Sequence, residues 1–155
     1  MCIRDRYASP GIIDQVLKVH DAFAICAPTI SQYAALAALR ATNGKDGEGD
    51  IFINKLVDAL DARRKLTCRR LDILGSLFSY QRPSGAYYVF PRIEGIPMKS
   101  MDLALRLLYE AKVICIPGNG FGPSGEGHIR FSFGGTDNEI NEAFDRIEEW
   151  ARISL

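Results

Sequence analysis

The sequence has no excess of charge of either sign, because 19 Lys and Arg residues face 19 Asp and Glu residues among its 155. A neutral chain has no global attraction to nucleic acid or to anionic lipid, so we expect neither as a partner. No apolar run is long enough to span a bilayer and no signal peptide is visible, which predicts a soluble, cytoplasmic protein. The length fits one ordinary domain or two small lobes.

Histidine is scarce, with two residues, and cysteine shows no ligand spacing. The four cysteines lie far apart without a C-x-x-C pair, which argues against a zinc site or a disulfide framework and predicts reduced thiols. Neither His20 nor His128 has a serine, cysteine or acid partner at a recognisable spacing, and no two carboxylates are placed for acid and base work. His20 continues an apolar stripe and is expected to be a packed core residue. The residues themselves therefore indicate no metal site and no catalytic group.

A long helix is predicted from Asp50 to about Leu74, where Gly75 ends it. Basic residues cluster once, at positions 63–70 of this segment, and Asp61 and Lys65 among them have the i,i+4 spacing that supports a helix surface. This spacing favours a solvated helix face over a nucleic-acid patch. Because the segment is apolar first and charged later, it is typical of a helix that joins two packing environments.

The other elements follow from capping signals and periodicity. Helices are expected from Ser9-Pro10, from Thr29 with Gln32 as a capping box, from Ser100 to Ala111, and from Thr136 with Glu139 as a second box. Strands are expected near residues 78–81, 86–90, 113–116 and 128–133. Residues 86–90 and 113–116 are apolar on both faces, so we expect both faces to be covered. The second half thus reads as an α+β lobe with a small sheet.

The strand predicted at residues 128–133 has two unlike faces. Arg130, Ser132 and His128 share one face, and the alternating apolar residues form the other. A guanidinium beside a hydroxyl suits a small anion, because arginine offers a planar fork of donors that matches a carboxylate. The alternative is a solvated edge strand whose arginine pairs with a surface acid. The glycine-rich residues 118–127 lead into a strand rather than a helix, which predicts a binding loop around Arg130 and not a nucleotide motif.

Three collinear segments resemble the C-terminal part of the class I/II aminotransferases, the fold type I enzymes that use pyridoxal phosphate. SQYAALAAL resembles the family's helix after the cofactor lysine region. RRLDILGSLFSYQRPSGAYYVFPRI is similar to the family's R-R-x-x-[IL]-x-x-x-L followed by P-x-G-[AG]-[FY]-Y-x-F. VICIPGNGFGPSGEGHIRFSFGG resembles its V-x-x-x-P-G-x-x-F-G-x-x-G-x-x-x-[IVL]-R-[IVLF]-S-[FY]. Together the matches extend over nearly the whole chain from Tyr7.

The resemblance implies roles for individual residues. Arg130 matches the arginine that holds the α-carboxylate of the amino acid substrate, and Ser132 follows it in the same strand. Gly118 and Phe121 match the loop that shapes the substrate side of the site. Tyr7 resembles the tyrosine that ends the family's G-x-R-x-G-Y strand, which implies a cofactor contact. Two further aromatic positions of the family pattern are matched by Tyr87 and Tyr88.

The implied fold is α/β, namely the C-terminal part of a fold type I transferase. It consists mainly of the small α+β domain with a short antiparallel-containing sheet, plus trailing helices of the large domain. Residues 7–49 are then the end of the large cofactor-binding domain, 50–74 a long interdomain helix and 75–155 the small domain. Residues 1–6, MCIRDR, fit no element and are interpreted as a non-native scar.

The implied activity is transfer of an amino group between an amino acid and a 2-oxo acid through pyridoxal phosphate, in a homodimer. In the family the Schiff-base lysine lies before the matched segments, so we expect a truncated, inactive chain that supplies the substrate-carboxylate clamp. Two alternatives stay open: an effector-binding domain of a transcription regulator built on the same fold, and a cofactor-free module that binds its ligand through Arg130.

Overall fold

The computed structural model describes residues 8–23, 26–42 and 47–155, and the chain forms two compact units, Met1–Lys55 and Leu56–Leu155. Tyr7 and the predicted scar at residues 1–6 lie outside the described residues. Among the helices that the structure describes, none has both the length and the apolar character needed to cross a membrane.

The first unit contains α1 (Pro10–Phe23) and α2 (Thr29–Ala41), and no residue described in either helix is buried. α1 begins as predicted, because the Ser9 carbonyl accepts hydrogen bonds from the next turn. The expectation of a packed His20 is wrong, since its side chain is 57% exposed and lies beside Asp21. The apolar stripe of α1 has no core to enter within the described residues of this unit.

The predicted capping box of α2 is wrong as well. The residue before the helix is Pro28, and no side chain caps the helix. Gln32 instead donates from Nε2 to the carbonyl of Ala27 at 2.7 Å. Thr29 is already helical, so its hydroxyl is not placed to accept from the first turn.

The long helix is confirmed as α3 (Glu48–Ile73), with Gly75 in the turn that follows it. Asp61 accepts from Lys65 at 2.7 Å, which is the predicted i,i+4 pair. From the same basic stretch Arg70 reaches across to a second helix, α5 (Asp137–Ser154), where its Nη2 bonds one aspartate and one glutamate at 2.5 and 2.7 Å. The basic stretch therefore serves helix packing as well as solvation.

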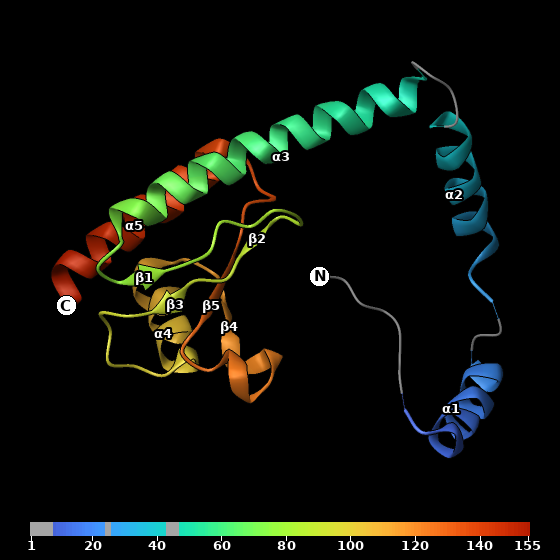
Figure 1. Ribbon diagram of the computed structural model, residues 1–155, viewed down its shortest axis with the longest axis horizontal. Helices are drawn as coiled ribbons and strands as arrows, with labels where there is room; N and C mark the ends of the chain where they lie inside the picture. Colours follow the sequence, from blue (N-terminus) through green and yellow to red (C-terminus); the bar gives the residue numbers. More distant parts are fainter. Residues whose placement is uncertain (1–7, 24–25, 43–46) are drawn as a thin grey trace. The chain divides into compact units, whose positions relative to one another are not determined.

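The second unit is built on two small antiparallel sheets (Figure 1). β1 (Phe78–Ser79) pairs with β3 (Arg92–Ile93), a strand that the sequence did not predict. The other sheet has the order β2-β5-β4, from β2 (Tyr88–Val89), β5 (Ile129–Ser132) and β4 (Ile116–Pro117). β5 is thus the central strand, and each neighbour pairs with it alone.

One face of this sheet packs on helices. α3 and α5 lie side by side on it (Figure 1), and the capping box predicted at Thr136 and Glu139 is present in full at the start of α5. Phe131 of β5 contacts Phe78 and Phe144 with ring centroids 5.9 and 5.8 Å apart. The buried apolar side chains include Leu71, Phe78, Val89, Leu103, Leu107, Ile129, Phe131, Phe133, Ile140, Phe144, Ile147 and Trp150.

The helix predicted from Ser100 to Ala111 is confirmed over that range, but its cap and its last turn differ from the prediction. α4 (Ser100–Arg106) continues into a π turn (Leu107–Ala111), after which Lys112 is left-handed at φ 58°. Ser100 does not cap the helix with its own side chain. Glu126, 26 residues later, does so instead by accepting from the amide and the hydroxyl of Ser100 at 2.8 and 3.0 Å.

The opposite face of the sheet is open within the described residues. Ile114 is 80% exposed, and Ile116 and Phe90 are 39% and 40% exposed. The expectation that residues 86–90 and 113–116 are covered on both faces is therefore wrong for this structure. The apolar residues of this outer face surround the predicted binding strand, which is why they matter for the site.

Candidate functional site

Arg130 lies near the middle of the open face of the sheet. Its cross-strand partner in β4 is Ile116, while Ser132 faces Tyr88 of β2. The predicted alternation of β5 is confirmed, because Ile129 is buried, Arg130 is half-buried and Ser132 is exposed. The backbone of Arg130 is hydrogen-bonded to a strand on each side, so the point from which its side chain extends is fixed.

Two aromatic rings hold the guanidinium of Arg130. Its Cζ lies 4.3 Å from the centroid of the Tyr88 ring and 4.9 Å from that of the Phe121 ring. Tyr88 comes from β2 and Phe121 from the 3₁₀ turn Gly118–Phe121 that follows β4, so the rings approach from opposite sides of β5. Rings favour the flat faces of a guanidinium, which leaves its N–H edges for an acceptor.

The aromatic contacts extend beyond Arg130. Phe121 meets Phe90 edge to face at 5.6 Å, and the Phe90 ring stacks on the imidazole of His128 at 5.0 Å. Nδ1 of His128 lies 3.2 Å from the carbonyl of Glu126. A continuous row of rings thus borders the arginine and positions Phe121 against it.

No carboxylate among the described residues pairs with Arg130, whose contacts there are the two rings. Other arginines of the same unit do have acidic partners, such as Arg63 with Asp137 and Arg106 with Glu110. The alternative of a surface ion pair is therefore not what the described residues form. The hydrogen-bonding edges of Arg130 are available to a ligand.

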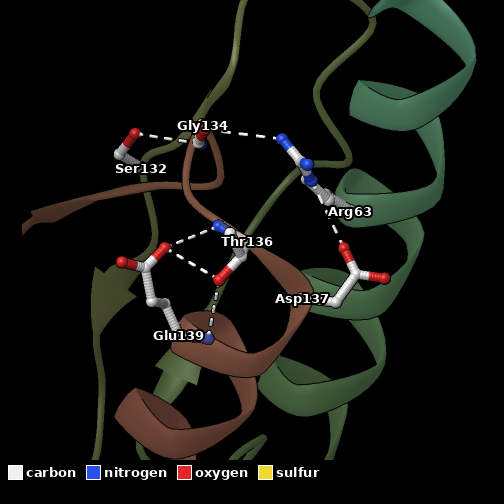
Figure 2. A network of polar contacts seen from close by, with 6 residues as sticks. All are labelled: Arg63, Ser132, Gly134, Thr136, Asp137 and Glu139. Atoms are coloured by element: carbon white, nitrogen blue, oxygen red, sulfur yellow. Dashed lines mark hydrogen bonds and ion pairs between the residues drawn. The ribbon is translucent and has the colours of Figure 1, made fainter. Parts of the chain in front are cut away.

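The hydroxyl of Ser132 is oriented by the turn that follows β5. Its Oγ accepts the amide of Gly134 at 3.2 Å, as Figure 2 shows. Because a hydroxyl both donates and accepts, its proton is still free to be donated. Arg130 and Ser132 therefore offer donors on the same face of one strand.

Gly118 shapes the loop through close backbone packing. It is buried, and its amide donates to the carbonyl of His128 at 2.8 Å. A Cβ on Gly118 would lie 2.0 Å from the carbonyl oxygen of Gly125, and a Cβ on Gly125 would lie 2.1 Å from the carbonyl oxygen of Gly118. Only two glycines can meet in this way, and their contact places the turn that carries Phe121.

Cys115 lies just before β4, the strand that leads into this loop. Burial raises the pKa of its thiol to about 11, so the thiol stays protonated at neutral pH and is a poor nucleophile. It therefore adds no chemistry to the face that carries Arg130.

The structure brings four of the five predicted site residues into one unit: Arg130, Ser132, Gly118 and Phe121. The fifth, Tyr7, lies outside the described residues. The sequence matched Tyr88 to a family position without assigning it to Arg130, although pairing of the predicted strands would have placed it beside the arginine.

The family model described as aminotransferase class I and II matches residues 6–147. An aspartate aminotransferase of Pyrococcus abyssi is 36% identical over 146 residues, which are 94% of this chain and 36% of that protein. An aromatic-amino-acid aminotransferase of Thermococcus litoralis is 32% identical over 142 residues, 92% of this chain and 35% of the relative. The crystal structure of an aromatic aminotransferase from Pyrococcus horikoshii matches with a TM-score of 0.76 at 34% identity, covering 92% of this chain and 36% of that one. The chain thus spans little more than a third of each relative.

Proposed function

Because the chain belongs to the class I and II aminotransferases, we propose that it provides the substrate-carboxylate clamp of an enzyme that exchanges amino and keto groups between an amino acid and a 2-oxo acid. Its fold is the α/β fold of the fold type I aminotransferases, as the sequence predicts. The observation that supports the clamp most directly is the position of Arg130, over the rings of Tyr88 and Phe121 and with no acidic partner among the described residues.

The clamp works by presenting two kinds of donor to one carboxylate. The guanidinium of Arg130 donates two parallel N–H bonds, and the hydroxyl of Ser132 can add a third bond from the same face. Because the Cζ of Arg130 lies over the rings of both Tyr88 and Phe121, little conformational freedom remains to be lost on binding. Fixing the carboxylate orients the rest of the substrate and raises the chance of reaction at its α-carbon.

The described residues do not by themselves fit a site for pyridoxal phosphate, the cofactor that this family uses as an electron sink. A Schiff-base lysine has to be shielded, whereas every lysine in residues 8–23, 26–42 and 47–155 is exposed where its burial is described. Tyr7, the predicted cofactor contact, lies outside those ranges. The inactivity of the 155-residue chain alone and its assembly into a homodimer stay predictions.

The test is binding of pyruvate, a minimal 2-oxo acid, to the isotopically labelled 155-residue chain, followed by NMR at the Arg130 Nε–H. We expect a saturable shift at this signal, and Arg130→Gln should weaken binding by about 2 to 4 kcal/mol, the range for losing a partner of a desolvated charge. Arg92→Gln is the matched control, because Arg92 lies in the neighbouring sheet with a 66% exposed side chain. Equal pyruvate affinity of wild type and Arg130→Gln would rule out the clamp.

A further inference from the structure

Arg63 of α3 contacts the turn that leaves the binding strand (Figure 2). Its Nη1 donates to the carbonyl of Gly134 at 3.5 Å, and its Nε donates to Oδ1 of Asp137 at 3.2 Å. The Arg63 side chain is 24% exposed, against 65% for that of Asp137. A largely covered arginine of α3 therefore bonds both the turn, at Gly134, and the first residue of α5, Asp137.

Gly134 connects Arg63 to the site through both of its backbone polar groups. Its carbonyl accepts from Arg63, and its amide donates to Oγ of Ser132 at 3.2 Å. A Cβ on Gly134 would stand 3.4 Å from the Tyr87 ring and 3.5 Å from Oγ of Ser132, so the backbone passes close to both. Movement of this peptide changes the direction in which the Ser132 hydroxyl points.

The far end of the same turn is also held. Thr136 and Glu139 form the capping box, in which Glu139 Oε2 accepts the Thr136 amide at 2.7 Å and the Thr136 hydroxyl accepts the Glu139 amide at 3.3 Å. These bonds, which Figure 2 shows beside Arg63, fix the start of α5. With the helix start fixed, Arg63 is the described side chain that ties the near end of the turn to α3.

We infer that Arg63 is a positioning residue that acts through Gly134 on the hydroxyl of Ser132, an assignment that rests on the proposed carboxylate clamp. While Oγ of Ser132 accepts from Gly134, its proton stays free to be donated away from the turn, on the face where Arg130 would hold a carboxylate. Without Arg63 the Gly134 carbonyl loses its side-chain partner, and the Gly134 backbone is less able to hold the Ser132 hydroxyl in one rotamer. The ligand then loses an oriented donor and keeps the guanidinium.

The experiment is a double-mutant cycle on pyruvate binding to the 155-residue chain, with Arg63→Gln, Ser132→Ala and the combined variant. We expect Arg63→Gln and Ser132→Ala each to weaken the affinity for pyruvate about 3- to 10-fold, which is the scale of one net hydrogen bond. The combined variant should be no weaker than Ser132→Ala alone, because Arg63 acts only through that hydroxyl. Arg69→Gln removes the same charge from the same helix and should leave the affinity unchanged.

The thermal midpoint of each variant separates positioning from general loss of structure. Additive effects of Arg63→Gln and Ser132→Ala, or an equal loss of affinity in Arg69→Gln, would overturn the assignment while leaving the clamp intact. If pyruvate does not shift the NMR signal of the Arg130 Nε–H in the wild-type chain, the proposed function is contradicted. The role of Arg63, which rests on that function, is then contradicted as well.

Discussion

A single backbone contact sets the position of Phe121. An alanine Cβ at position 118 would lie 2.0 Å from the carbonyl oxygen of Gly125 and 2.6 Å from that of His128. Both are backbone atoms that cannot rotate aside, so the loop has to shift. We expect Gly118→Ala to lower the free energy of unfolding by about 1 to 3 kcal/mol, as overpacking does, measured by urea denaturation.

The control for this substitution lies two residues away. A Cβ on Gly120 meets nothing within 4 Å, so Gly120→Ala adds the same methyl group to the same loop without a clash. If Gly118→Ala and Gly120→Ala unfold at the same urea concentration, the close approach of the two glycines does not constrain the loop.

Single residues also show how far sequence reasoning reaches into the site. The shared face of Arg130 and Ser132 was predicted because alternation within one strand is a local property, and the burial pattern of β5 confirms the alternation. Their assignment to a substrate site came from the family resemblance. The contribution of Arg63 was not predicted, because its bonds to Gly134 and Asp137 join residues that are 71 and 74 positions apart in the sequence. No local pattern distinguishes this arginine from its basic neighbours on α3.

At the scale of elements, α4 depends on a carboxylate from a distant loop. Hydrogen bonds from the Ser100 amide and hydroxyl lower the pKa of Glu126 from its ordinary 4.5. The ionised form therefore stabilises the folded chain above that pH, and the stabilisation is lost as the pH falls through the folded-state pKa. We expect Glu126→Gln to lower the thermal midpoint at pH 7, and the difference from wild type to narrow below about pH 4.

Glu149→Gln provides the comparison for this pH series. Glu149 is an exposed carboxylate of α5, and its removal changes net charge by the same amount. A midpoint difference for Glu126→Gln that stays constant from pH 7 to pH 3 would contradict the capping role.

The presence and type of the helices and strands were predicted better than the residues at which they begin and end. Every helix expected from periodicity is present, and the capping box of α5 is complete. The predicted cap at Ser100 was wrong because donors at a helix start can be satisfied from outside the local sequence, as Glu126 does for α4. The predicted cap at Thr29 was wrong because the helix begins one residue early, at Thr29 itself. β3 was missed because its two residues, an exposed Arg92 and a half-buried Ile93, belong to no apolar run.

For the whole molecule, the open apolar surface of α1 predicts self-association. Ile12, Val16 and Val19 are 57%, 48% and 59% exposed, and they line one shallow hollow with their neighbours. Contiguous exposed apolar side chains favour association in water. We expect sedimentation velocity to show larger species as concentration rises, and the double change Val16→Gln and Val19→Gln to reduce them.

Lys18→Gln tests whether this effect belongs to the apolar surface, because it alters a polar residue of the same helix. Equal association of wild type, Lys18→Gln and the double variant would place the contact elsewhere.

The order of strands in the main sheet also decides when that sheet can form during synthesis. Among the described residues, β5 is the last strand along the chain, yet it is the central one, and β2 and β4 pair there only with it. Until Ile129–Ser132 leave the ribosome, the two earlier strands have no partner in this sheet. A stop codon a few residues before Ile129 therefore removes more than the clamp, because it leaves two strands unpaired and exposes their edges to aggregation.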